Sequence, residues 1–365
     1  MTGGPVDGDA PCRGLDPAWL AQQLAEGFNS ARPAVAFDRF IGTGQMSRNA
    51  RFTVVWDEPT AGPESIVVKV PSGNPSTRAV SADSGIYQRE CAFYSTVREL
   101  VDIRVPKPLA VSCDDDGLDF AILLEDLRRS TQGDHLEGLD DGQIDLAIGQ
   151  AAALHAPLWD VDHPALSAIG SDAEDRGRRV QALVEMILPV CLERLRTGLD
   201  DDVPRFLDAF VPRIADWVAT PRTTASVVHG DFRADNFLFG DHPEAPPLAV
   251  VDWQTVTTGA GVTDISYLLG GTLEVDRRRV EETARLDQYR AELAARGADY
   301  PAHACFDDYA LGTPHGITTA LVATVMADET ERGDALFALM LNRHTHHAID
   351  VDLLDRIAPP PLSNS

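Results

Sequence analysis

The residues best suited to chemistry lie in one polar loop that two apolar runs flank. The loop holds an aspartate, Asp231, and five residues later an asparagine, Asn236; sixteen residues further on, the apolar run 248–251 ends in Asp252. Carboxylate and amide oxygens are the ligands that Mg²⁺ prefers, and such a site leaves room for substrate phosphates. An aspartate beside it is placed to accept a proton from an attacking hydroxyl group. The pattern therefore indicates a magnesium site beside a candidate proton acceptor.

Each motif alone has a simpler interpretation, because an HGD triplet is often a turn and an acid after an apolar run is often a strand end. Together, in this order and spacing, the residues resemble the aminoglycoside phosphotransferase and choline kinase superfamily, which has the protein-kinase-like fold. Residues 229–236 read HGDFRADN and match the HGDxxxxN catalytic loop, while 252–254, DWQ, look like the counterpart of DFG. Glutamine at the third position departs from the glutamate of many relatives.

The resemblance implies a role for each matched residue. Asp231 would be the catalytic base, Asn236 and Asp252 the magnesium ligands, and His229 a support for the loop. Arg233 occupies the place where protein kinases often carry a lysine that faces the γ-phosphate, and it could hold the transferring charge.

In this fold, a lysine on a strand of the first lobe pairs with the phosphates and with a glutamate on a helix. Lys69, one of two lysines in the chain, lies in an apolar β-rich run. Its compact charge can approach phosphates where a planar guanidinium fits poorly. The resemblance implies Glu90, on the predicted helix 84–101, as its partner. The alternatives are a solvent-facing charge on an edge strand and a surface pairing of Glu90 with arginines.

Two further segments resemble nucleotide-binding parts of the family. Gly42 and Gly44, between two β-rich runs, allow close approach of the backbone to phosphates, and Ser47 replaces a third glycine. A tight hairpin would have the same sequence pattern. Backbone groups near Glu125 and Leu127 are the implied adenine contacts, with an ordinary strand followed by a polar turn as the alternative.

The predicted secondary structure changes near residue 125. Short β-rich runs and one helix at 84–101 occupy 35–124, whereas helical patterns dominate beyond, with one β-rich insertion at 225–257. We expect an α+β, two-lobed protein-kinase-like fold: a β-rich nucleotide-binding lobe, 1–125, and a larger helical lobe, 126–365, with the catalytic loop and acceptor site. The hinge sequence LLEDL and the HGDF form most resemble the ecdysteroid-kinase-like branch. The helices predicted in the second lobe are 143–155, 178–195, 203–218, 264–272, 283–295, 317–327 and 335–347.

Composition excludes several classes of protein. The 31 basic and 57 acidic residues give a net charge of −26, which disfavours binding to nucleic acid or anionic membranes. Beyond residue 125 there are 20 basic and 40 acidic residues, so we expect a neutral or cationic acceptor. No apolar run approaches the ~18 residues of a membrane-spanning helix, and the start of the chain has no signal pattern. We therefore expect a cytoplasmic protein.

The function predicted is transfer of the γ-phosphoryl group of ATP, with Mg²⁺, to a hydroxyl of a small molecule: an antibiotic, sugar, amino alcohol or steroid-like alcohol. The alternative is a nucleotide-binding sensor or scaffold without phosphotransfer, against which the set Lys69, Asp231, Asn236 and Asp252 argues. The helical half also offers side chains for an acceptor site: Trp159, Tyr267, Tyr309, His315, Arg343, His344, His346 and His347.

Overall fold

The computed structural model describes residues 12–42, 46–170 and 173–357. The chain divides into two compact units, which are described separately below. The first comprises Met1–Glu99, Arg104–Thr131 and Gly240–Thr255; the second comprises Leu100–Ile103, Gln132–Phe239 and Val256–Ser365. The segment 240–255 thus belongs with the first unit although it comes late in the chain. The predicted lobe boundary after residue 125 stays a prediction.

The first unit is built on a five-stranded antiparallel sheet in the order β1-β2-β3-β5-β4. The central strand β3 is buried at every position, because both faces of the sheet are covered. Its apolar sequence therefore reflects two-sided burial rather than an alternating edge strand. The strands are β1 Ala34–Ile41, β2 Ser47–Val55, β3 Ser65–Pro71, β4 Pro108–Cys113 and β5 Phe120–Glu125.

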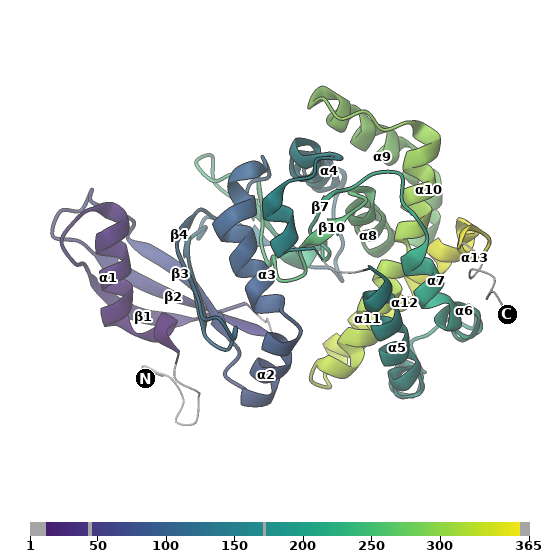
Figure 1. Cartoon of the computed structure of the whole chain (residues 1–365), viewed down its shortest axis with the longest axis horizontal. Helices are drawn as coiled ribbons and strands as arrows, with labels where there is room; N and C mark the ends of the chain where they lie inside the picture. The colour runs from purple at the N-terminus through teal and green to yellow at the C-terminus, as the bar shows by residue number, and fades with distance from the viewer. Residues whose placement is uncertain (1–11, 43–45, 171–172, 358–365) are drawn as a thin grey trace. The chain divides into compact units, whose positions relative to one another are not determined.

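Helices cover the two faces of this sheet (Figure 1). Helix α1, Pro17–Phe28, packs its buried leucines against Val68 and Val70. Because neighbouring strand residues point to opposite faces, Lys69 faces the other side, where α3, Ile86–Ala92, brings Glu90. A further helix, α2 Pro75–Asp83, lies outside the sequence prediction of one helix at 84–101, and the predicted helix continues past α3 as a π-helical turn and a 3₁₀ turn.

The second unit is mainly helical and also holds β7, Ser226–Val228, paired antiparallel with β10, Thr257–Gly259. One predicted helix, 203–218, is two, because Pro212 lies in a 3₁₀ turn between α6 and α7. Helix α10 was not predicted. No helix in the described ranges is both long and apolar enough to cross a membrane. The helices are α4 Asp141–His155, α5 Ala173–Leu195, α6 Asp202–Phe210, α7 Ile214–Ala219, α8 Val262–Thr272, α9 Val275–Ala295, α10 Ala302–Gly312, α11 Pro314–Met326, α12 Glu331–Asp350 and α13 Leu353–Arg356; the remaining short strands are β6 Ser130–Gln132, β8 Phe237–Gly240 and β9 Leu248–Val250.

Candidate active site

The loop after β7 is fixed through its backbone by a buried carboxylate at the start of α8. Asp264 accepts hydrogen bonds from the backbone N–H groups of His229, at 2.7 Å, and Gly230, at 3.0 Å, and it lies 3.2 Å from Nε2 of His155. Burial acts to raise the pKa of Asp264, but these hydrogen bonds hold it below its usual value. Gly230 has a φ of 81°, in the region that favours glycine. The HGD triplet is therefore a rigidly held turn.

The carboxylate of Asp231, directly after this turn, receives three donors. Tyr267 Oη and Arg233 Nε donate to Oδ1 at 2.9 and 3.0 Å, and Asn236 Nδ2 donates to Oδ2 at 2.8 Å. Burial acts to raise the pKa of Asp231, but the charge of Arg233 and the hydrogen bonds outweigh it and lower the pKa. The His229 ring supports the loop, because its Nδ1 accepts the backbone N–H of Asp231 at 3.1 Å. Asp231 is thus ionised at neutral pH and able to accept a proton.

Arg233 is held by two carboxylates of its own loop. Besides Asp231, it donates from Nη1 to Oδ2 of Asp235 at 2.5 Å, and only a fifth of its side chain is exposed. Its predicted contact with the transferring phosphate stays a prediction.

Asn236 has a fixed amide orientation. Its Nδ2 donates to the backbone oxygen and to Oδ2 of Asp231, both at 2.8 Å. The amide oxygen therefore points to the other side of the group, and no hydrogen bond to it is found among the described residues. An oxygen presented in this way suits a hard cation such as Mg²⁺.

In the first unit, the ammonium of Lys69 lies between two carboxylates. Its Nζ is 2.7 Å from the carboxylate of Glu90 and 2.7 Å from Oδ1 of Asp252. Burial acts to lower the pKa of Lys69, but the charges of Asp252 and Glu90 outweigh it and raise the pKa, so the ammonium stays charged. Lys69 is 4% exposed, which rules out the alternative of a solvent-facing edge charge.

Asp252 is held in a left-handed conformation, with φ of 68°, which few non-glycine residues adopt. The next residue, Trp253, fixes it there. The backbone N–H of Trp253 donates to Glu90 Oε1 at 3.2 Å, and its indole stacks on Phe93 with 3.7 Å between ring centroids. Trp253 and Phe93 were not among the predicted site residues; the only signal in the sequence was a large aromatic residue directly after the acid.

The predicted phosphate loop lies partly outside the described residues, and Gly44 is among those outside. Gly42 has a φ of 74° and Ser47 is buried at the start of β2. The positive φ explains a glycine at position 42 without showing a phosphate contact.

The predicted hinge follows β5. The Glu125 side chain accepts hydrogen bonds from Arg104 Nη2 at 2.7 Å and from the backbone N–H of Lys107 at 3.0 Å, and Leu127 is half-buried. The adenine contacts implied at Glu125 and Leu127 stay predictions.

Several side chains considered for the acceptor site belong to the core instead. Tyr267, His344 and His347 are at most 1% exposed. The ring nitrogens of His344, His347 and the equally buried His135 have no hydrogen-bond partner among the described residues. Burial lowers the pKa of all three, to about 3 for His135, so they are neutral. They form no metal site, because no suitable cluster of ligands occurs in the described ranges.

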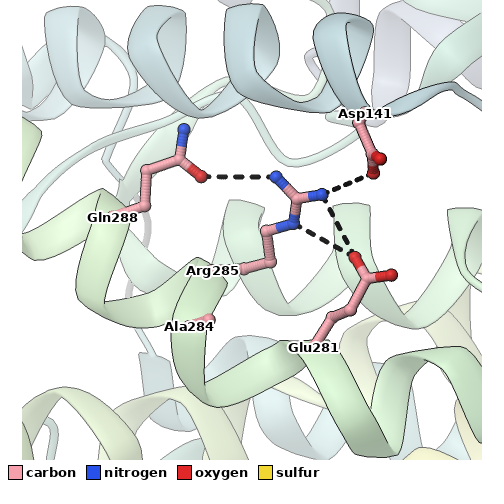
Figure 2. Close-up of a pocket in the computed structure, with 5 residues that line it drawn as sticks. All are labelled: Asp141, Glu281, Ala284, Arg285 and Gln288. Atoms are coloured by element: carbon pink, nitrogen blue, oxygen red, sulfur yellow. Dashed lines mark hydrogen bonds and ion pairs between the residues drawn. The ribbon is translucent and has the colours of Figure 1, made fainter.

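A surface pocket between α4 and α9 is filled by ion pairs (Figure 2). Arg285 reaches Asp141 at 2.7 Å, Asp145 at 2.6 Å and Glu281 at 3.1 Å, and Gln288 completes the cluster. Every charged group drawn there has a partner, so the cluster joins the two helices rather than binding a substrate.

Solved structures show the same fold. A protein of Ralstonia eutropha JMP134, provisionally named an aminoglycoside phosphotransferase, has a TM-score of 0.52 at 16% identity over 94% of this chain and 98% of its own. The GDP complex of aminoglycoside 2′-phosphotransferase-IIIa has a TM-score of 0.52 at 16% identity over 90% of this chain and 98% of its own. Ethanolamine kinase of Plasmodium vivax has a TM-score of 0.50 at 9% identity over 87% of this chain and 82% of its own. These neighbours confirm the predicted protein-kinase-like fold.

Two curated proteins each match a short stretch of the chain. Acyl-CoA dehydrogenase family member 11 of Gallus gallus is 51% identical over 43 residues, which are 12% of this chain and 5% of that protein. Family member 10 of Mus musculus is 53% identical over 47 residues, 13% and 4% respectively. Each match is a small part of the relative concerned.

The model of the ecdysteroid kinase-like family matches residues 44–299. The match spans most of the chain and includes Lys69, Glu90 and Asp252 of the first unit and the Asp231 loop of the second. It confirms the superfamily and the branch that the HGDF and LLEDL motifs indicate. The chain belongs to the ecdysteroid kinase-like family.

Proposed function

We propose that this enzyme transfers the γ-phosphoryl group of ATP to a hydroxyl of a small molecule, with Asp231 as the catalytic base. The observation that supports this most is the Asp231 carboxylate, which is mostly buried, kept ionised and held by three donors on a rigid loop. A general base must be ionised and fixed within reach of the proton it takes. Asp231 meets the first condition, and its loop provides the second.

In the proposed reaction, the acceptor hydroxyl gives its proton to Asp231 as its oxygen bonds to the γ-phosphorus. The bond from that phosphorus to the bridging oxygen breaks, and ADP leaves with the electron pair. The charge on the phosphates needs fixed cations, because phosphoryl transfer depends mainly on positioning and electrostatic stabilisation. Lys69 is suited to that task, because its pKa is raised and the ammonium stays charged. Arg233 would assist from the catalytic loop.

Mg²⁺ fits the residues present. The amide oxygen of Asn236 has no donor among the described residues, and the Asp252 carboxylate is partly exposed. Both offer the hard oxygen atoms that the ion prefers. We propose both residues as ligands of the ion. Bound Mg²⁺ would neutralise charge on the β- and γ-phosphates.

The acceptor is proposed to be neutral or cationic. Beyond residue 125 the chain has twice as many acidic as basic residues, 40 against 20. Such a field attracts cations and repels anions. Amino alcohols and aminoglycosides fit this description, as do uncharged sterol-like alcohols.

The test is Asp231→Asn, which keeps the shape of the side chain and removes its basicity. Turnover should fall by about 10²–10⁴-fold, the usual contribution of a general base. Affinity for Mg-ATP, measured by calorimetry, should stay unchanged. ADP release would be followed with water, choline, ethanolamine, kanamycin and ecdysone as acceptors.

The matched control is Asp308→Asn, a buried carboxylate in α10 that binds Thr223 and Tyr300 rather than the loop. It should retain turnover. Full activity in Asp231→Asn would contradict the assignment of the base. Nucleotide binding by the wild type, with no ADP release on any acceptor including water, would favour a nucleotide-binding module instead.

A further inference from the structure

Tyr267 is a buried tyrosine aimed at the proposed base. Its hydroxyl donates to Oδ1 of Asp231 at 2.9 Å. Its ring stacks on His344, with 5.2 Å between centroids and 13° between planes, and meets the edge of His315 at 5.3 Å. The side chain is 1% exposed, so these rings leave it one position. The hydroxyl is therefore fixed on the carboxylate.

Helix α8 holds the catalytic loop at two points. Asp264 binds the backbone of the HGD turn, and Tyr267, three residues later on the same helix face, binds the side chain of Asp231. One rigid element thus sets both the path of the loop and the direction of its carboxylate. A helix is a more exact support for this purpose than a loop.

The two oxygens of Asp231 are not equivalent. A carboxylate has about four lone-pair positions, two on each oxygen. Oδ1 accepts from Tyr267 and from Arg233, whereas Oδ2 accepts from Asn236 alone. Oδ1 is saturated, and Oδ2 keeps one position for another donor.

We propose that Tyr267 is a positioning residue: together with Arg233 it occupies Oδ1 and leaves Oδ2 as the atom that takes the proton of the acceptor hydroxyl. This inference rests on the proposed function, because it assumes that Asp231 is the base. The proton passes to Oδ2, the acceptor oxygen bonds to the γ-phosphorus, and ADP departs.

Tyr267 can donate throughout the working pH range. Burial and the neighbouring charge of Asp231 raise the pKa of its phenol well above the ordinary value. The hydroxyl therefore keeps its proton and cannot replace Asp231 as the base. Its effect is to orient the carboxylate and to stabilise the ionised form.

The first test is Tyr267→Phe, which removes the hydroxyl and keeps the ring between the two histidines. kcat at pH 8 should fall about tenfold, the effect of one hydrogen bond to a charged group, with the KM for ATP unchanged. The acid limb of the kcat profile should move up by about one pH unit, because loss of a donor to the ionised carboxylate raises its pKa. Rates would be measured with water and with kanamycin and choline as acceptors.

The matched control is Tyr300→Phe. Tyr300 is equally buried, and its hydroxyl donates to the buried carboxylate of Asp308 at 2.6 Å. The same atom is removed from the same kind of pair outside the catalytic loop. Thermal stability should fall comparably in both variants, whereas kcat and its acid limb should change only in Tyr267→Phe.

A second measurement needs no acceptor. The carboxyl carbon of Asp231 would be titrated by ¹³C NMR in protein labelled at aspartate, with the signal assigned by its absence in Asp231→Asn. Its pKa should rise in Tyr267→Phe and stay constant in Tyr300→Phe. Unchanged titration and unchanged kcat in Tyr267→Phe would overturn the inference. If the pKa of Asp231 shifts in Tyr267→Phe but the wild type releases no ADP with any acceptor, the proposed function is overturned. The positioning role then falls with it, while the hydrogen bond stands.

Discussion

Lys69 neutralises two carboxylates at once. Its ammonium lies 2.7 Å from each, and Glu90 is 1% exposed. Without this charge, Glu90 and Asp252 would face one another with no cation between them. Removing one partner of a buried ion pair leaves an uncompensated charge, which costs far more than an exposed pair contributes.

Lys69→Met should therefore lower the free energy of unfolding by about 3–5 kcal/mol at pH 8. This loss of free energy of unfolding should be smaller at pH 5.5. Burial raises the pKa of Glu90, and without the lysine it rises further, so the folded variant takes up a proton that the unfolded chain binds less tightly. Urea denaturation of wild type and variant at both pH values measures the difference.

The control is the other lysine. Lys107 is exposed, and Lys107→Met should change the free energy of unfolding by less than about 0.5 kcal/mol. If Lys69→Met lost the same free energy of unfolding at both pH values, the proposed uptake of a proton by Glu90 in the folded variant would be wrong.

Motif spacing predicted Asp231, Asn236 and Asp252 as site residues, and the family resemblance predicted the pairing of Lys69 with Glu90, which the structure shows. Motif spacing could not show that Tyr267 contacts Asp231. Thirty-six residues separate the two, and only the packing of α8 beside the loop brings them together. The stack of Trp253 on Phe93 was equally hidden, because ring contacts between distant segments leave no periodic signal.

At the scale of elements, α8 has to approach the buried imidazoles closely. A Cβ on Gly270 would lie 2.6 Å from Nδ1 of His347 and 2.8 Å from Nδ1 of His344, both on α12. Gly271 is similarly close to His135, at 2.7 Å from its Cε1. The two glycines are therefore required by packing, although glycine is a poor helix former.

Gly270→Ala should destabilise the protein by about 1–3 kcal/mol, the usual cost of overpacking a core. Gly149→Ala is the matched control: Gly149 lies inside α4, and apart from the neighbouring backbone of its own helix no described atom lies within 4 Å of the added Cβ, so the change should stabilise by about 0.5–1 kcal/mol. Denaturant unfolding gives both values. A stabilised Gly270→Ala would show that the rings move aside.

Periodicity found the long helices with a clear apolar face and failed where other signals decide. Helix α10 buries the charged Asp308 along with its apolar residues, so its pattern is weak. Helix α2 was marked only by its first residues, with Asn74 as the N-cap and Pro75 at the first position. Fold class was still predictable, because it depends on the change from β-rich to helical texture rather than on each element.

At the scale of the whole molecule, stability should depend on pH through His135, His344 and His347. They are neutral in the folded protein because burial lowers their pKa, but in the unfolded chain they titrate near the ordinary ~6.5. Below that pH the unfolded state binds more protons. The stability they contribute is present above pH ~6.5 and is lost as the pH falls.

The free energy of unfolding should therefore drop by about 4 kcal/mol between pH 8 and pH 5.5, roughly 1.4 kcal/mol for each histidine. Urea denaturation at several pH values measures the loss. His135→Asn should reduce it by about a third, since the unfolded chain then binds one proton fewer. An unreduced loss in this variant would contradict the assignment.

The family and fold were predictable from the sequence, and the acceptor was not. The HGDxxxxN motif and the lysine–glutamate pair indicate a class of reaction, and the fold that carries them does not decide the substrate. The side chains named for the acceptor site illustrate the difficulty: of these, Tyr267, His344 and His347 lie in the core.

The ion-pair cluster of Figure 2 is relevant to stability at alkaline pH. Its cation, Arg285, is one of 29 arginines in a chain with only two lysines. A lysine begins to lose its charge near pH ~10, whereas a guanidinium keeps its proton beyond pH ~12. Arg277 on α9 also bridges to Asp141 on α4, and its hydrogen bond to Glu281 raises the pKa of its guanidinium, so this bridge persists in alkali. We therefore expect the free energy of unfolding to fall in mild acid, through the buried histidines, and to change much less in mild alkali.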